Sequence, residues 1–313
     1  MNQNSKGALG VVMLLVTAMI WGSAFVAQAL GMESLGAFSF GSIRTLLGGF
    51  VLLVFILIRE AVFSAHNSAE AVRIRRRHIM YSVRKGIPVG IVFFLATNFQ
   101  QYAFNYSTAG KIAFITALYI LFVPMYDLFR GKKLPLTNWI AVVLGIVGLY
   151  FLCIGEEGLG GINPGDILTM ICALLFTAHI IIIDTVAGGT DGVVVSCTQF
   201  ILAGSVTMIL MFIFESPVQI ENVRSAAVPI LYSGIMSCAV AYTFQIIGQK
   251  YVRSSVASLL MSMESVFAVL AAALVLSEVP TERELAGCVI MFISVILAQL
   301  PAFRRKEQPR QSR

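Results

Sequence analysis

The sequence carries little charge for its length. Only 12% of its 313 residues are Asp, Glu, Lys or Arg, roughly half of the ~25% that is usual in soluble domains. Hydrophobic residues make up 58% of the chain, and the mean hydropathy is +0.86. This composition excludes an ordinary soluble domain and indicates an all-α integral membrane protein. Little chain remains outside the apolar runs, so we expect no separate soluble catalytic domain.

Residues that hold metals, disulfides or phosphates are also scarce. The five cysteines fall in apolar runs without a Cys-x-x-Cys pair, which favours small packing residues. Of three histidines, His66 and His78 lie in a basic segment, so no metal site is expected. The run Gly158-Leu159-Gly160-Gly161 lacks the strand and the Gly-Lys-Ser/Thr of a phosphate-binding loop. We therefore predict no cofactor, and the absence of paired acids or a Ser/His/Asp set argues against an enzyme.

Ten apolar runs of about 20 residues are present instead, each long enough to cross a membrane as a helix. They are expected near 8–30, 36–58, 86–105, 109–129, 137–154, 165–186, 192–214, 226–248, 254–276 and 283–301.

The two halves of the chain repeat one another. Asn98-Phe99-Gln100 and Thr243-Phe244-Gln245 are related by an offset of 145 residues, from 100 to 245. Leu46-Leu47-Gly48-Gly49 matches Ile201-Leu202-Ala203-Gly204 at an offset of 155, from 46 to 201. Each copy holds five spans, and an odd number of spans forces the copies into opposite orientations. Inverted repeats of this kind are typical of secondary transporters, with the substrate site between the repeats.

The repeat defines the expected domain organisation. We predict a first repeat over 1–156, with a basic cytoplasmic loop at 59–85 that contains the ten extra residues. A second repeat should cover 157–303, and a basic cytoplasmic tail should cover 304–313.

Positive charge lies mostly on one side of the predicted bundle. Of 22 lysines and arginines, eighteen fall in the termini and loops expected on the inner side, and only Arg224 and Arg283 fall in outer loops. The positive-inside rule therefore predicts a multi-pass protein of the cytoplasmic membrane with both termini in the cytoplasm. The same distribution argues against nucleic acid as a partner. The cluster from Arg73 to Arg77 either sets this topology or also binds anionic lipid of the bilayer.

Short motifs in both halves resemble those of a known transporter group. They are Trp21-Gly22-Ser23-Ala24-Phe25, Arg44, Lys132-Lys133-Leu134-Pro135, Met263-Glu264-Ser265-Val266-Phe267 and Ser277-Glu278-Val279-Pro280. Through them the whole chain resembles the drug/metabolite transporter superfamily, in particular its EamA-type ten-helix branch. Ser265 stands where that family has a proline. The resemblance implies a polyspecific inner-membrane transporter, often an exporter of amino acids, metabolites or drugs.

Two charges in the middle of spans are the first candidates for function. Glu264 lies about ten residues into the span 254–276, where an isolated acid costs roughly 2.5–3.5 kcal/mol. It either contacts a substrate ammonium or carries a proton, or it forms a structural pair with Arg44. Arg44 itself corresponds to Gln199 in the second repeat, so it has a role in one copy only. It either binds a substrate carboxylate or serves as a gate or pair for Glu264.

Uncharged polar and aromatic side chains complete the expected cavity. His179 is either a proton shuttle or a neutral packed histidine. Asn98, Gln101 and Tyr102 share one helix face, and Gln245 has a related position in the second repeat. Such residues either line a wet cavity or join helices by hydrogen bonds. The expected aromatic walls include Trp21, Phe25 and Tyr119.

The sequence as a whole predicts a secondary transporter that moves small metabolites, amino acids or drug-like solutes, with export as the expected direction and proton coupling as one option. Alternating access would arise by rocking one repeat against the other. A nucleotide-sugar or sugar-phosphate exchanger is the alternative within transport, but it needs a cationic cavity. A lipid-modifying membrane enzyme is the alternative of another class, but it needs clustered acids or histidines.

Overall fold

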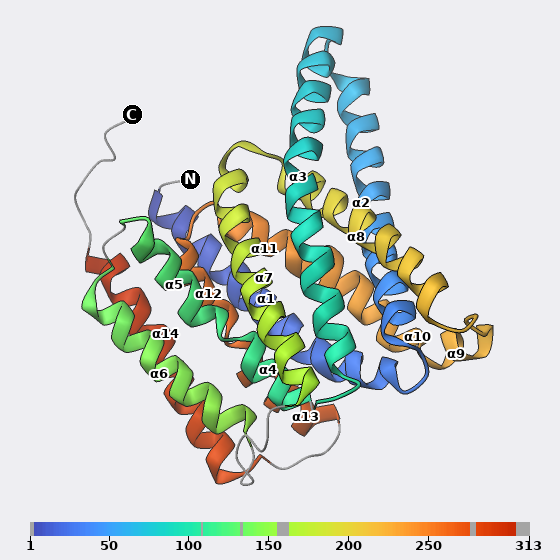
Figure 1. Ribbon diagram of the computed structural model, residues 1–313. Coiled ribbons are helices and arrows are strands. Elements are labelled where there is room, and N and C mark those ends of the chain that lie inside the picture. Colours follow the sequence, from blue (N-terminus) through green and yellow to red (C-terminus); the bar gives the residue numbers. More distant parts are fainter. Residues whose placement is uncertain (1–2, 108, 132–133, 155–162, 276–279, 305–313) are drawn as a thin grey trace.

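The computed structural model describes residues 3–107, 109–131, 134–154, 163–275 and 280–304, and this part of the chain is helical with no strand (Figure 1). Its helices are α1 (Gln3–Met32), α2 (Ala37–His66), α3 (Ala69–Ala103), α4 (Ala109–Thr116), α5 (Tyr119–Phe129), α6 (Leu136–Cys153), α7 (Pro164–Val186), η1 (Ala187–Gly189), α8 (Gly192–Phe214), α9 (Ile220–Ser225), α10 (Ala227–Leu231), η2 (Tyr232–Tyr242), α11 (Thr243–Gly248), α12 (Ser254–Met261), α13 (Glu264–Val275) and α14 (Glu282–Arg304).

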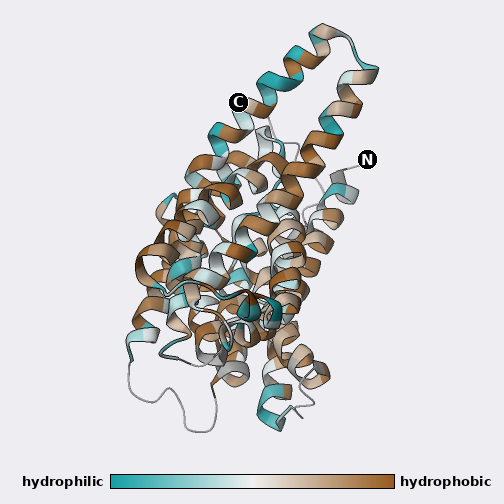
Figure 2. Cartoon of the chain, turned by 90° about the vertical axis from the view of Figure 1, so that its right-hand side faces the viewer, coloured by the Kyte–Doolittle hydropathy of each residue, from teal (hydrophilic) through white to brown (hydrophobic). Residues whose placement is uncertain are grey.

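The described helices have the length and composition of membrane spans. When neighbouring helical elements are joined, eight stretches among the described residues are long and apolar enough to cross a bilayer. α6 is a shorter apolar helix. Large apolar side chains face outward, for example Phe55 at 53% and Phe212 at 75% exposure. Figure 2 shows hydrophobic residues along most of the bundle, with hydrophilic ones concentrated toward its ends. The predicted all-helical membrane fold is therefore confirmed.

The predicted basic loop at 59–85 was wrong, because this segment is a helical hairpin. α2 continues to His66, and α3 begins at Ala69 after a turn in which the Ser68 hydroxyl accepts a hydrogen bond from the Ala71 N–H at 3.3 Å. Arg and Glu have high helix propensities although they prefer solvent, so the charge of this segment does not exclude a helix. The hairpin extends beyond the bundle at the end where α1 begins and α14 ends (Figure 1).

Helices from the two repeats are interleaved. α2 packs along α8, α6 packs along α14, and α3 packs against both α7 and α8. Close packing of α3 on α8 depends on Gly86, where a Cβ atom would lie 2.8 Å from Thr198 Cβ. Most of the core is therefore made between the repeats.

Two spans are broken at equivalent points. The expected spans 109–129 and 254–276 are each divided in two, between Thr116 and Tyr119 and between Met261 and Glu264. Each break contains a backbone hydrogen bond that reaches three residues back, and the two bonds match at the offset of 145: Leu118 N to Ile115 O corresponds to Met263 N to Leu260 O. At the second break the Ser262 hydroxyl donates to Leu259 O at 2.8 Å and so competes with the backbone hydrogen bonds of the helix.

The eighth predicted span contains a further irregularity. Its central part, η2, is eleven residues of π-helix between the α-helical turns of α10 and α11. π-Helical segments inside helices are frequent at functional sites. The corresponding part of α3 in the first repeat is α-helical and contains Pro88. The two repeats thus differ where they approach the centre of the bundle.

Candidate functional site

A small cavity lies at the centre of the bundle, between helices of both repeats. Its volume is about 40 Å³, measured as space for the centres of water molecules. Because one water needs roughly 10–15 Å³ on this measure, the cavity has room for a few waters. It is lined by Trp21, Ala24, Phe25, Gln28, Arg44, Gln100, Thr116, Tyr119, Phe176, Ser237, Tyr242 and Glu264.

The two broken helices meet across this cavity. Tyr119 is the first residue of α5 and Glu264 is the first residue of α13. The Tyr119 hydroxyl donates to Glu264 Oε1 at 3.1 Å, and the two residues are 145 positions apart. This is the offset of the repeat, so equivalent positions touch each other on the pseudo-two-fold axis. Both half-helices begin at this contact, and the positive ends of their helix dipoles favour negative charge nearby.

Two aromatic residues of the cavity also occupy equivalent positions in the two repeats. Trp21 and Phe176 both line the cavity and are related by the offset of 155. The Trp21 ring lies 4.5 Å from the ring of Tyr242, which comes from η2. Trp21 can reach the centre because its neighbour Gly22 lets α1 touch the start of α13. A Cβ atom on Gly22 would lie 2.5 Å from the carbonyl oxygen of Glu264.

Arg44 supplies the positive charge of the cavity. Its side chain is buried, Nη2 donates to Gln101 Oε1 at 3.4 Å, and the guanidinium lies 5.6 Å from the Phe40 ring centre. Glu264 is equally buried and accepts from Tyr119. In the described part of the chain no ion pair joins the two, so the structural Arg44–Glu264 pair, one of the alternatives considered for these charges, is not formed. Each charge is held by a neutral partner and remains available to a third group.

Several polar atoms at the cavity have no hydrogen-bond partner among the described residues. They are Trp21 Nε1, Gln28 Oε1 and Arg44 Nε, and all three are buried. Buried polar groups are normally paired, so these two donors and one acceptor are suited to a polar solute or to water. Within the described residues no group of three or more His, Cys, Asp or Glu could hold a metal ion.

The predicted site residues divide into two groups. Trp21, Phe25, Arg44, Tyr119 and Glu264 line the cavity together.

The other predicted residues lie elsewhere. Asn98 donates to the Thr207 hydroxyl at 2.7 Å and so joins α3 to α8. Tyr102 is 39% exposed and stacks on Phe38 at 5.7 Å. His179 is fully buried, 3.0 Å from Gln199 Oε1.

One of these residues acts on the cavity without lining it. Gln101 holds Arg44 through the hydrogen bond described above. Gln245 is buried, and its Oε1 has no partner among the described residues. The interhelical role considered for such side chains fits Asn98 directly.

Sequence reasoning missed cavity residues that the repeat itself could have indicated. Phe176 follows from Trp21 by the offset of 155, as Glu264 follows from Tyr119 by 145. Gln100 lines the cavity in place of Asn98 and Tyr102, and it donates to the Thr116 hydroxyl at 3.2 Å. Ser237 and Tyr242 are presented by the π-helix, which no sequence signal predicted.

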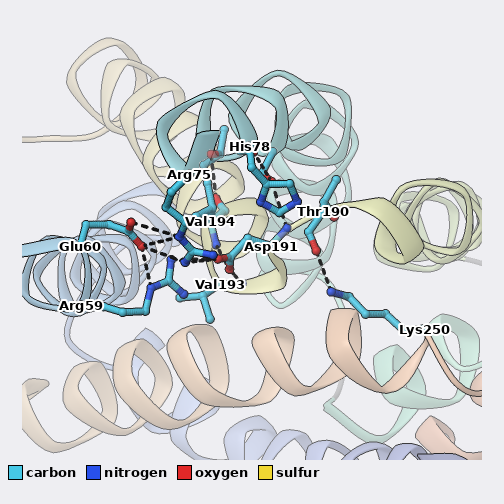
Figure 3. Close-up of polar contacts among 11 residues, drawn as sticks. Arg59, Glu60, Arg75, His78, Thr190, Asp191, Val193, Val194 and Lys250 are labelled. Carbon is cyan, nitrogen blue, oxygen red and sulfur yellow. Dashed lines mark hydrogen bonds and ion pairs between the residues drawn. The ribbon is translucent and has the colours of Figure 1, made fainter. Parts of the chain in front are cut away.

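A second polar group lies at the end of the bundle near the α2–α3 hairpin. We call Arg59, Glu60, Arg75 and Asp191 the ion-pair cluster (Figure 3). Asp191 Oδ2 lies 2.8 Å from Arg59 Nη2 and 3.1 Å from Arg75 Nη2, while Glu60 Oε1 lies 2.9 Å from Arg75 Nη2. Asp191 also caps α8 by accepting from the Val193 N–H at 3.1 Å. Burial raises the pKa of Asp191, but the Arg59 guanidinium, the Val194 N–H and the charge of Arg75 together hold it below its ordinary value.

Comparisons with known proteins agree with this architecture. The model of the EamA-like transporter family matches residues 8–154 and again residues 163–300. An uncharacterized transporter of Archaeoglobus fulgidus is 27% identical over 92% of this chain and 84% of its own length. An uncharacterized transporter of Bacillus subtilis, YoaV, is 20% identical over 96% of this chain and 99% of its own length. A solved crystal structure superposes with a TM-score of 0.74 at 17% identity, covering 95% of this chain and 99% of the other, which shows the shared fold. With one family unit in each repeat, the chain belongs to the EamA-like transporter family, a family of multi-pass membrane transporters and not of enzymes.

Proposed function

We propose that this transporter exports small solutes that carry both an amino group and a carboxylate, such as amino acids and zwitterionic metabolites or drugs. One observation carries the proposal: Arg44 and Glu264 line one cavity, and each is bonded to a neutral side chain instead of to the other. Two buried opposite charges are costly unless each meets a partner. A zwitterion offers a partner to both at once.

The contacts available to such a solute follow from the cavity. The Arg44 guanidinium, with its unpaired Nε, suits bidentate recognition of a carboxylate. Glu264 suits an ammonium group, and Tyr119 orients its carboxylate. Trp21, Phe176 and Tyr242 supply apolar faces for the side chain of the solute.

The volume of the cavity supports a cycle with open and closed states. Pockets for drug-sized ligands measure about 300–1,000 Å³, and this cavity of about 40 Å³ is much smaller. We therefore infer that the described conformation is a closed one and that transport uses alternating access. Glu264, the buried acid, is also the residue through which proton coupling would act.

We propose that the groups of helices that move against each other during transport are not the two sequence repeats. α2 and α8 are joined at one end by the ion-pair cluster. At the other end, Glu215 accepts from the N–H groups of Phe38 and Ser39, both at 2.8 Å, at the start of α2. Glu215 corresponds to Glu60 by the offset of 155. Since α2 belongs to one repeat and α8 to the other, we infer that this pair stays together and that the surrounding helices open.

The orientation in the membrane completes the proposal. The α2–α3 hairpin, the start of α1 and the end of α14 lie at the same end of the bundle (Figure 1). That end carries the arginines of the hairpin, so we place it, with both termini, in the cytoplasm of the cell.

Transport in proteoliposomes tests the proposal. The purified protein is assayed with zwitterionic amino acids, with the matching amines and with the matching carboxylic acids, with and without a pH gradient. Zwitterions should be preferred. Arg44→Gln should shift the preference toward amines, and Glu264→Gln should shift it toward acids. Equal transport of all three classes by the unaltered protein would overturn the proposed recognition by two charges.

A further inference from the structure

A groove separates α2 from α3 where the hairpin leaves the bundle. Its volume is about 260 Å³, larger than the central cavity. Leu57, Phe63 and Ile79 form apolar walls, whereas Ser64, Arg75 and Arg76 supply polar groups. A groove of this mixed kind fits an amphipathic ligand.

The groove lies along α2 at the height expected for the surface of the membrane. From Ala37 to Ile58, α2 carries a run whose charge is limited to Arg44, and 22 residues of helix span about 33 Å. This matches the ~30 Å hydrocarbon core of a bilayer. Leu57 and Ile58 remain about 60% exposed, as expected of side chains that face lipid. The groove therefore begins where acyl chains give way to headgroups.

Some charged side chains at the groove form ion pairs, and one does not. Glu60 is neutralised by Arg59 and Arg75, and Arg75 also contacts Asp191. Arg76 is exposed and has no hydrogen bond or ion pair among the described residues. One free guanidinium at the rim thus adds to a largely balanced cluster, and the groove has a net attraction for anions.

We propose that this groove binds an anionic phospholipid, with the phosphate on Arg76 and Ser64 and an acyl chain along Leu57 and Ile79. Guanidinium groups match phosphate geometry and retain their charge at all physiological pH values. Basic pockets between helices on the cytoplasmic side are suited to anionic headgroups. The ligand would lie beside Arg75, which links the hairpin to α8.

The chain offers matched variants for a test. Arg76→Ala removes the free guanidinium of the groove, while Arg77→Ala removes another exposed charge one residue away that does not line it. Ala61→Trp fills the groove without changing charge. All three positions are exposed, so the variants should fold, and their melting temperatures without lipid verify this.

Binding of phosphatidylglycerol to the full-length protein in detergent is measured by native mass spectrometry, with phosphatidylcholine and inorganic phosphate as comparisons. Arg76→Ala should weaken phosphatidylglycerol binding roughly tenfold, as expected for a lost hydrogen bond to a charged group. Ala61→Trp should abolish it, and Arg77→Ala should change it less than about twofold. Equal losses in Arg76→Ala and Arg77→Ala would show diffuse attraction and overturn the site. Equal binding of phosphatidylcholine, or saturation by inorganic phosphate alone, would overturn the assignment to an anionic lipid.

Discussion

Replacement of Glu264 by Gln separates a transport role of this acid from a structural one. The Tyr119 hydroxyl donates to Glu264 Oε1 at 3.1 Å, and a glutamine oxygen can accept the same bond. A hydrogen bond to a charged group contributes about 1.5–3 kcal/mol and one between neutral groups about 0.5–1.5, so the loss is on the order of 1 kcal/mol. Removal of a buried charge from mid-membrane offsets this by up to about 2.5–3.5 kcal/mol. Stability should therefore be unchanged or raised.

The absence of an ion pair with Arg44 in the described structure is essential to this estimate. Were the two paired, neutralising one would leave the other buried and unpaired, at a cost of about 3–5 kcal/mol. Arg44 instead donates to Gln101 at 3.4 Å, a contact that the substitution leaves intact. The melting temperature in detergent should thus not fall.

Transport should respond in the opposite way. Loss of a desolvated charge contact to a substrate ammonium costs about 2–5 kcal/mol, which corresponds to at least a thirtyfold lower rate at limiting substrate. The assay is uptake of the best zwitterionic substrate into proteoliposomes across a range of pH. Tyr119→Phe removes the hydrogen bond but keeps the charge, and Glu221→Gln removes an exposed acid in α9 as a matched control. Both should retain more transport than Glu264→Gln.

Two results would refute this reasoning. A markedly lower melting temperature, restored by Arg44→Gln, would show that the two charges form a structural pair. Full transport by Glu264→Gln at every pH would show that the charge serves neither substrate nor proton.

The remaining predictions concern packing, the ion-pair cluster and topology. Gly22→Ala should destabilise by about 1–3 kcal/mol in thermal unfolding, because its Cβ would lie 2.5 Å from a carbonyl oxygen of α13. Gly7→Ala on the same helix, with nothing within 4 Å, should not destabilise; equal effects would disprove the close contact. Asp191→Asn keeps the helix cap but should lose about 1–2 kcal/mol of ion pairing, between the values of exposed and buried pairs. Because the pKa of Asp191 is lowered from 3.8, this difference should be complete above that value and vanish as pH falls through the lowered pKa; a difference that persists in acid would contradict it. A single cysteine at Ser68 should react with an impermeant thiol reagent only from the cytoplasm and one at Asn222 only from outside, and the reverse pattern would invert the proposed topology.

The sequence was sufficient to predict an all-helical membrane fold because bilayer thickness and backbone hydrogen bonding leave few alternatives. Helix α8 runs from 192 to 214 as predicted, and α7 begins one residue earlier than predicted. The hairpin from Arg59 to Lys85 was missed because hydropathy indicates which part of a helix lies in the membrane, and does not indicate where the helix ends. Charged residues end a span without ending the helix that contains it.

The cavity was only partly predictable. Asn98, Gln101 and Tyr102 do share a face of α3, but a helical pattern does not say toward which neighbour that face turns. Its rotation is set by contacts such as Gly86 on Thr198 of α8. As a result Gln100 reaches the cavity, and Asn98 bonds to α8. The eleven residues of π-helix in η2 rotate Tyr242 relative to its position on a regular helix, which no residue pattern in one sequence reveals.

The contact between Tyr119 and Glu264 explains why the two repeats differ at this point. Equivalent residues meet on a pseudo-two-fold axis, so identical side chains there would have to face each other. Two carboxylates at about 3 Å cannot both remain ionised, and two tyrosines would leave the cavity without its acid. One tyrosine and one glutamate instead form a donor and acceptor pair at 3.1 Å. Arg44 departs from the repeat in another way, because its equivalent Gln199 carries no charge and lies 3.0 Å from His179. Departure from symmetry at the axis is thus a physical requirement for placing one acid and one base in a single cavity.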